Sequence, residues 1–157
     1  MSSKTQTYNL LLQQAQALLT QEYDVIANMS NLTALLFNNL PQVNSVAFYR
    51  WQNHELILGP LQGPPACMHI ALGKGVCGTV AQELTTKIVP NVLEFAGHIA
   101  CDPHSRSEIV IPIFQHNHFW GELDLDSPQF NHFDTIDATY LEQIAPLVFG
   151  YTPQPSK

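Results

Sequence analysis

The segment 107–127 constrains the fold of this 157-residue chain more than any other. Residues 108–114 and 118–126 are rich in strand-forming side chains, and the polar residues 115–117 between them predict a β-hairpin. Alternation along the second strand predicts two faces, with Phe119, Gly121, Leu123 and Leu125 on one and Trp120, Glu122, Asp124 and Asp126 on the other. The apolar face of such a sheet must be covered by other elements of the chain.

Helical periodicity at both ends of the chain supplies this cover. Apolar residues recur at helical spacing over about 5–40, which predicts two helices, and again over about 134–149, which predicts a third. Strands and active-site loops fill residues 43–127 between them. The sequence therefore predicts a single α+β domain over residues 1–157, with an antiparallel sheet flanked by helices.

The charge balance excludes several classes of partner. Six basic side chains face 13 acidic ones, for a formal net charge of -7, which argues against nucleic acid or an anionic membrane as a partner. No apolar run is long enough to cross a bilayer, and the N-terminus lacks the apolar stretch of a signal peptide. We therefore expect a cytoplasmic protein.

Three cysteines are present, an odd number that cannot be fully paired within one chain. Static disulfides are rare in the cytosol, so buried thiols, redox chemistry and metal ligation are the alternatives. Cys101 follows His98 and precedes Asp102 in a long polar loop, where a thiol can be reactive. A buried, inert role is equally compatible with the sequence. Cys77, between Val76 and Val80, fits a core position.

Two motifs suggest cofactors that their context does not support. Gly73–Gly78 matches the glycine spacing of a dinucleotide-binding loop, but no parallel βαβ unit surrounds it, and a turn that directs N–H groups at an anion fits better. The cysteine spacings match no structural zinc site, and Pro103 disfavours a helix that would align His98, Cys101 and His104. We expect neither a cofactor nor a metal.

The acidic face of the hairpin also has two interpretations. It is the solvated side of an ordinary antiparallel strand, or a wall that binds an ammonium group or supplies a proton. Glu108, at the start of the first strand, is placed to reach the same end of the hairpin as Asp126. Crowded carboxylates raise one another's pKa, which keeps one of them protonated as an acid.

Taken together, several segments resemble the free methionine (R)-sulfoxide reductases, a family of GAF domains. The resemblance runs from about residue 43 to the end and rests on Leu58–Gly63, Ala66–Cys67, Gly73–Thr79, Gly97–Asp102, Ser107–Val110 and Leu123–Ser127. It implies a GAF-like fold, the activity of an L-methionine (R)-S-oxide reductase and a homodimer. A non-catalytic GAF sensor of a small molecule or of redox state is the alternative.

For the cysteines, the resemblance implies distinct roles. Cys101 would attack the sulfoxide sulfur and become a sulfenic acid. Cys67 would then form a disulfide with Cys101, and thioredoxin or a similar dithiol would reduce it. Cys77 would be a recycling thiol at most.

The resemblance also assigns the pocket. Glu108 and Asp126 would activate the sulfoxide oxygen, Asp124 together with Glu108 would bind the substrate ammonium, and Tyr49 would contact the methyl–sulfur end. Many relatives carry a Trp in the first strand, about where this chain has Ser45. Trp51 and Trp120 are the aromatic residues available to replace it.

Overall fold

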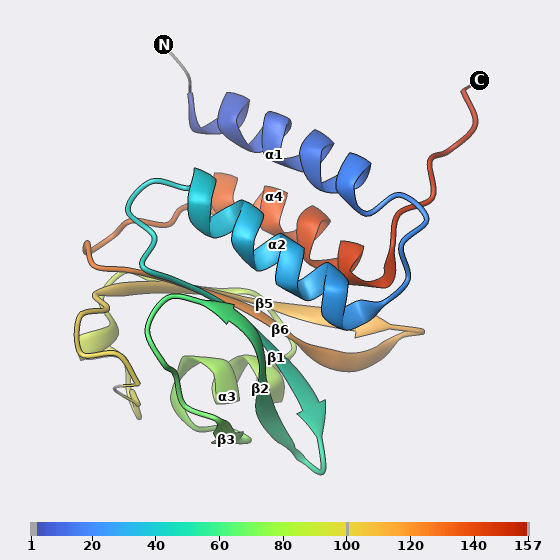
Figure 1. The fold of residues 1–157 in the computed structure, drawn as a ribbon. Coiled ribbons are helices and arrows are strands. Elements are labelled where there is room, and N and C mark those ends of the chain that lie inside the picture. The colour runs from blue at the N-terminus through green and yellow to red at the C-terminus, as the bar shows by residue number, and fades with distance from the viewer. Residues whose placement is uncertain (1–2, 100, 157) are drawn as a thin grey trace.

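The computed structural model describes residues 3–99 and 101–156 and has the predicted α+β architecture (Figure 1). The helices are α1 (Lys4–Leu18), α2 (Val25–Asn39), α3 (Gly75–Glu83) and α4 (Thr135–Ile144). The strands are β1 (Ser45–Gln52), β2 (Glu55–Gln62), β3 (His69–Ala71), β4 (Lys87–Val89), β5 (Ser107–Gln115) and β6 (His118–Ser127). Short 3₁₀ helices span Val92–Glu94 and Ala145–Phe149. The second of these continues α4, because Pro146 lacks the N–H that an α-helix would need.

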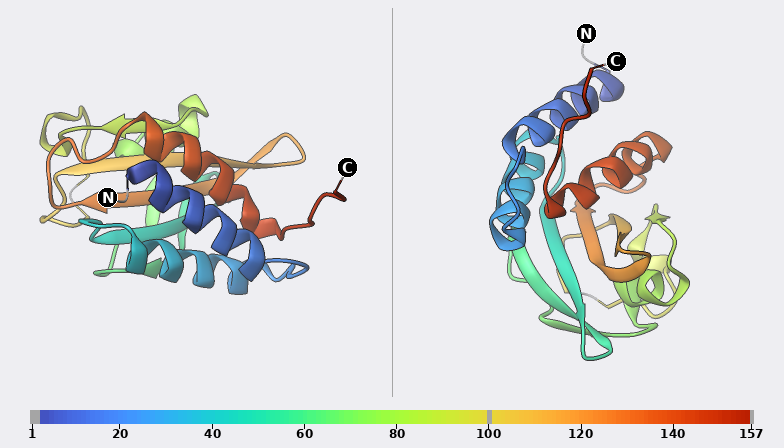
Figure 2. Two further views of the ribbon diagram at one scale, coloured as in Figure 1. Left: turned by 90° about the horizontal axis from the view of Figure 1, so that it is seen from above. Right: turned by 90° about the vertical axis from the view of Figure 1, so that its right-hand side faces the viewer.

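All six strands form one antiparallel sheet in the order β3-β2-β1-β6-β5-β4. β5 and β6 form the predicted hairpin, and β6 pairs on its other side with β1, so β6 lies at the centre of the sheet. The sheet is strongly curled, as Figure 2 shows. Because of this curl, the sheet has a concave face and a convex face, and different helices pack on each.

Three helices cover one face of the sheet. α2 and α4 lie against the strands and α1 lies over these two helices, whereas α3 lies on the opposite face (Figures 1 and 2). The apolar side chains of β6 that face the three helices, Leu123 and Leu125, are fully buried, as the alternation predicted. α1 is tied to α4 by the Tyr8 hydroxyl, which donates a 2.7 Å hydrogen bond to Asp137 Oδ1.

A β-bulge in the hairpin changes the predicted faces at one end of β6. Phe114 pairs with Phe119 and Ile113 pairs with Gly121, so Trp120 is an extra residue in β6. Trp120 therefore packs against Phe149 on the helical side, and Phe119 packs against Trp51 on the other side. The predictions that Trp120 shares a face with Glu122 and Phe119 a face with Leu123 were therefore wrong, because strict alternation does not hold across a bulge.

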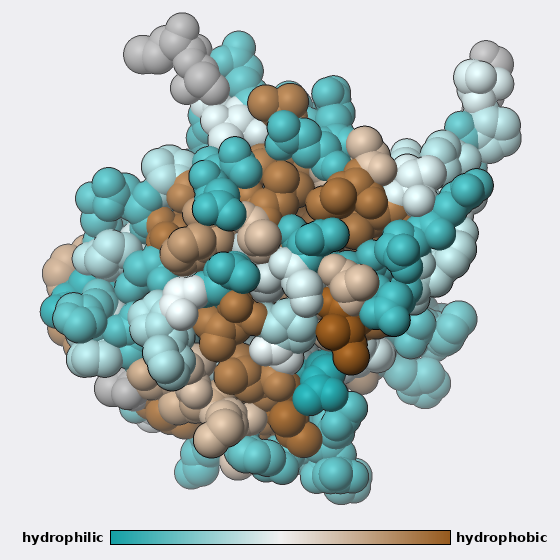
Figure 3. Space-filling view, viewed as in Figure 1, coloured by the Kyte–Doolittle hydropathy of each residue, from teal (hydrophilic) through white to brown (hydrophobic). Residues whose placement is uncertain are grey.

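The outer surface of the helical layer mixes apolar with polar side chains, as Figure 3 shows. Leu10 and Ile26 are 56% and 67% exposed there. Among the described residues, no helix combines the length and the apolar character needed to span a membrane.

Candidate active site

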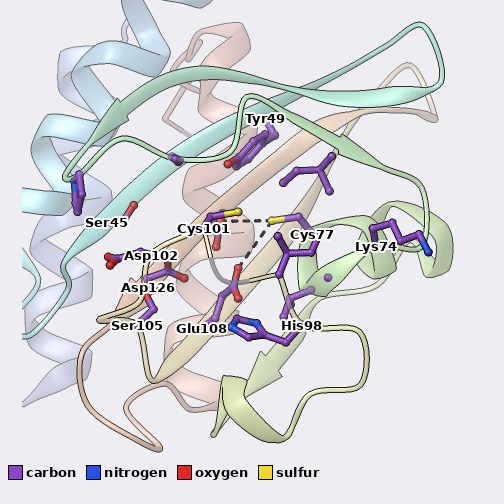
Figure 4. Close-up of a pocket in the computed structure, with 18 of the residues that line it drawn as sticks. Ser45, Tyr49, Lys74, Cys77, His98, Cys101, Asp102, Ser105, Glu108 and Asp126 are labelled. Carbon is purple, nitrogen blue, oxygen red and sulfur yellow. Dashed lines mark hydrogen bonds between the residues drawn. The ribbon is translucent and has the colours of Figure 1, made fainter.

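A cavity of about 50 Å³ lies between the concave face of the sheet and α3 (Figure 4). Its polar lining comes from four parts of the chain that are distant in sequence. These residues are Ser45 and Tyr49 of β1, Lys74 and Cys77 at α3, His98, Cys101, Asp102 and Ser105 of the long loop, and Glu108, Asp124 and Asp126 of β5 and β6. The predicted site residues thus converge on one cavity, with the exception of Cys67.

Strand register places the carboxyl groups in this cavity. Glu108 pairs directly with Asp126, and Asp126 pairs on its other side with Ser45. Paired residues of an antiparallel ladder point to the same face, so these three side chains are neighbours. Asp124 lies two residues along β6 and points to the same side.

The approach of α3 to the sheet depends on glycine. A Cβ on Gly78 would collide with the carbonyl oxygen of Ala71, so a larger residue would push α3 away from β3. The N–H of Gly75, where φ is +62°, donates a 3.2 Å hydrogen bond to Gly97, which joins the start of α3 to the long loop. These glycines, which resembled a nucleotide-binding motif, therefore serve close packing around the cavity.

Cys67 and Cys101 form a disulfide, with Cα atoms 5.4 Å apart. Cys101 lines the cavity, whereas Cys67 lies outside its lining, before β3. The pair that the resemblance implied is thus bonded, between two half-buried residues on separate loops. Such a pair can open and close without disturbing the sheet.

Cys77 is the remaining thiol, and it is buried in the core cluster that α3 forms with the sheet, as its apolar neighbours predicted. Its thiol donates to Asp124 Oδ2 at 3.4 Å and lies 3.9 Å from Glu108 Oε1 (Figure 4). Burial and the surrounding carboxylates raise the pKa of Cys77 well above its ordinary value. The thiol form is therefore favoured at this position.

The carboxyl groups of the cavity also favour their neutral forms. Burial raises the pKa of Glu108 well above its ordinary value, and the nearby Asp124 and Asp126 raise it further. Burial likewise raises the pKa of Asp126, and repulsion from Asp124 adds to the effect. The acidic face of the hairpin is therefore an enclosed acid cluster rather than a solvated strand face.

Glu108 and Asp124 differ in their hydrogen bonding. The proximity of the two carboxyl groups raises the pKa of Glu108 and lowers that of Asp124, and the hydrogen bond from the Cys77 thiol also lowers the pKa of Asp124. Burial is the largest influence on Asp124 and keeps its pKa above the ordinary value. Of the two, Glu108 is the better proton donor and Asp124 the better carboxylate.

The loop that carries Cys101 is anchored to the neighbouring ends of β1 and β6 by residues that follow the cysteine. Asn44 Nδ2 donates to Asp102 Oδ2 at 3.2 Å, and the Arg106 N–H donates to the carbonyl of Ser127 at 2.8 Å. Burial is the largest influence on the pKa of Asp126 and raises it, whereas the nearby Ser105 hydroxyl lowers it. Ser105 had no distinguishing signal in the sequence, since its role depends on the path of the loop.

Tyr49 is the aromatic residue of the cavity among the described residues. Its ring is 2% exposed, and its hydroxyl donates a 3.0 Å hydrogen bond to the carbonyl of Cys67. Neither Trp51 nor Trp120 lines the cavity, so neither replaces the tryptophan expected near Ser45. Ser45 itself lines the wall beside Asp126 and leaves this part of the cavity more open than an indole ring would.

Comparisons with known proteins agree with this geometry. The family model described as GAF domain matches residues 24–148. Protein YtsP of Bacillus subtilis is 47% identical over 90% of this chain and 88% of its own length. The free methionine-R-sulfoxide reductase of Escherichia coli is 39% identical over 90% of this chain and 86% of its own.

A solved structure is similarly close. The fRMsr of Staphylococcus aureus in complex with substrate is 48% identical, covers 91% of this chain and 95% of its own, and superimposes with a TM-score of 0.86.

Proposed function

Because the chain belongs to the GAF domain family, and within it to the free methionine-R-sulfoxide reductases, we propose that it reduces free L-methionine (R)-sulfoxide to L-methionine. One observation carries the proposal for this chain. Cys101, bonded to Cys67, lines a cavity that also contains a buried, proton-bearing acid cluster. Sulfoxide reduction by thiols needs these two components, a pair of cysteines and an acid for the oxygen.

The first step uses the reduced enzyme. The Cys101 thiolate attacks the sulfoxide sulfur while Glu108 or Asp126 protonates the sulfoxide oxygen. The attack joins the two sulfur atoms. The hydroxyl group then passes from the substrate sulfur to the Cys101 sulfur as both the sulfur–oxygen bond and the new sulfur–sulfur bond break, which releases methionine and leaves Cys101 as a sulfenic acid. We assign the proton to Glu108, because burial and repulsion from Asp124 and Asp126 raise its pKa and favour its neutral form.

The second step regenerates the thiols. The Cys67 sulfur attacks the sulfenic acid, the Cys67–Cys101 disulfide forms, and the hydroxyl leaves as water with the Cys67 proton. Two thiols have then been oxidised to one disulfide and one sulfoxide reduced to a thioether. Thioredoxin or a similar dithiol reduces the disulfide by exchange, which places the reaction in the cytoplasm, where such reductants are maintained. Cys67 lies outside the cavity lining and is half-buried, and we assign it as the sulfur that such a partner attacks.

The acid cluster also accounts for selectivity toward the free amino acid. The α-ammonium group of free methionine sulfoxide would pair with Asp124 and the nearby Glu108. In a peptide this group is an uncharged amide, and the buried carboxylate would lose its partner. The Tyr49 ring, fully enclosed beside the cavity, would contact the methyl–sulfur end of the substrate.

Incubation with racemic free methionine sulfoxide and dithiothreitol tests the proposal. We expect loss of the R epimer alone, whereas N-acetylmethionine sulfoxide, which lacks the ammonium group, should remain. Binding of the free amino acid without turnover would instead support a GAF sensor. An enzyme that consumes neither epimer under reducing conditions would refute the proposed activity.

A further inference from the structure

The acid cluster of the proposed active site also brings together a set of donor atoms suited to a metal ion, one of which, Cys77 Sγ, has no role in the proposed reaction. Cys77 Sγ, a Glu108 oxygen and an Asp124 oxygen all lie within 4.8 Å of one another. They come from three elements, α3, β5 and β6, so no spacing motif in the sequence could indicate them. We propose that Cys77, Glu108, Asp124 and Glu122 form a binding site for a borderline divalent cation, of which Zn²⁺ is the type.

The distances among these donors fit a tetrahedral ion. Zinc–sulfur bonds of about 2.3 Å and zinc–oxygen bonds of about 2.0–2.2 Å place sulfur and oxygen ligands about 3.5 Å apart. Cys77 Sγ lies 3.4 Å from Asp124 Oδ2 and 3.9 Å from Glu108 Oε1. These three donors therefore need only small side-chain adjustments to bind an ion, whereas Glu122 lies outside the set within 4.8 Å and must turn toward the ion to become the fourth ligand.

Glu122 provides independent support for a ligand at this position. It is 0% exposed, and neither of its carboxyl oxygens has a hydrogen-bond partner among the described residues. It shares a face of β6 with Asp124. Burial and Asp124 raise the pKa of Glu122 and the nearby Cys77 thiol lowers it, so its carboxyl group lies beside the donor set. A buried carboxyl without partners is costly, and a cation would satisfy it.

Asp124 has one carboxyl oxygen without a hydrogen-bond partner among the described residues. Its Oδ2 accepts from Cys77, but its buried Oδ1 has no partner in the described part of the chain. The described residues that line the cavity include only one lysine, Lys74, and no arginine. The site thus combines several acidic donors with one sulfur donor, a set that suits zinc or cadmium better than the oxygen-preferring magnesium or calcium.

Binding must release protons. The Cys77 thiol becomes a thiolate as its sulfur bonds to the metal, and its proton passes to the buffer, together with protons held by the acid cluster. If the proposed function holds, the ion would occupy the position of the substrate ammonium and inhibit reduction. The metal site itself does not depend on that function.

The oxidised protein gives a direct test, because Cys77 is then the only free thiol. Co²⁺ added to this form should produce a thiolate-to-cobalt charge-transfer band, and one equivalent of Zn²⁺ should abolish it. Calorimetry in buffers of different ionisation enthalpy should report proton release. Absence of the band from the wild-type oxidised protein would refute the site without recourse to any variant.

Substitutions then identify the ligands. Cys77→Ser should remove the cobalt band and weaken zinc binding about tenfold or more, whereas Glu122→Gln should keep the band and weaken binding several-fold. Glu94→Gln, at an exposed acid on the 3₁₀ turn, is the matched control and should change neither quantity. Unchanged zinc affinity in a folded Glu122→Gln protein would exclude Glu122 as a ligand and contradict the proposed site. Sulfoxide turnover is measured separately, so its failure would not affect this result.

Discussion

Glu108 and Asp126 lie directly opposite each other on β5 and β6, and both side chains point into the cavity that Cys101 lines. Burial raises the pKa of both carboxyl groups, and repulsion within the cluster raises it further. At least one of the two therefore keeps its proton at a pH at which an exposed acid would be ionised. The pairing of β5 with β6 therefore positions the protonated acid that the proposed reaction requires.

The first prediction concerns Glu108→Gln. Loss of the proposed proton donor should lower kcat/KM for free methionine (R)-sulfoxide by about 10²–10⁴-fold, the usual contribution of a general acid. Because burial raises the pKa of Glu108, wild-type activity should fall as pH rises through this raised pKa. Rates measured across the pH range check both points. Glu94→Gln, an exposed acid, is the control, and wild-type activity in Glu108→Gln would exclude the assigned role.

The two disulfide cysteines should fail at different steps. Cys101→Ser should release no methionine, even in a single turnover, because the nucleophile is missing. Cys67→Ser should release the first equivalent of methionine but stop when thioredoxin is the reductant, since no disulfide can form. Rapid-quench measurement of methionine per enzyme distinguishes the variants. Normal thioredoxin recycling in Cys67→Ser would show that another thiol resolves the sulfenic acid.

Stability should depend on pH through Glu122. Burial raises its pKa well above the ordinary value, so the folded chain holds a proton that the unfolded chain loses above about pH 4.3. The contribution of protonated Glu122 to the free energy of unfolding is complete below about pH 4.3, the pKa in the unfolded chain. This contribution is lost as pH rises through the raised pKa of the folded chain. Glu122→Gln stays neutral and should therefore be about 1–3 kcal/mol more stable than wild type near pH 8, and equal to it near pH 4.

Urea unfolding at the two pH values measures this difference in the free energy of unfolding. Glu94→Gln should match the wild type at both, because Glu94 is exposed. A stability gain of the same size at both pH values would mean that the effect comes from packing and not from ionisation.

Gly121 should tolerate no side chain. A Cβ at this position would collide with the carbonyl oxygen of Tyr49, although the backbone does not require the left-handed region. Gly121→Ala should therefore lower the free energy of unfolding by about 1–3 kcal/mol, the usual cost of overpacking. Gly59→Ala, in β2, is the comparison, because its nearest contact would be 3.1 Å. Equal thermal stability of the two variants would contradict this account.

The sequence predicted the fold where its signals were local. The apolar periodicity over 5–40 and the alternation of Leu123 and Leu125 depend on neighbouring residues, and the structure has helices and a buried strand face there. Trp120 departs from its predicted face because a bulge is set by how two strands pair, which a single strand does not reveal.

The residues of the site were predicted only in part. The resemblance indicated which residues to consider, and the structure places Cys101, Glu108, Asp124, Asp126 and Tyr49 around one cavity. Their roles stay predictions. Ser105 and the isolation of Glu122 could not be foreseen, because both depend on how the long loop and α3 fold over the sheet.

The register of β6 separates two kinds of position within a single strand. Leu123 and Leu125 hold the helical layer, whereas residues 122, 124 and 126 lie on the opposite face, where 124 and 126 line the cavity. Exchanges at the latter three, and at 45 and 108 across the ladder, would alter charge and shape inside the cavity while leaving the helix contacts in place. A combinatorial library confined to these five codons would therefore explore new ligand chemistries on a constant scaffold.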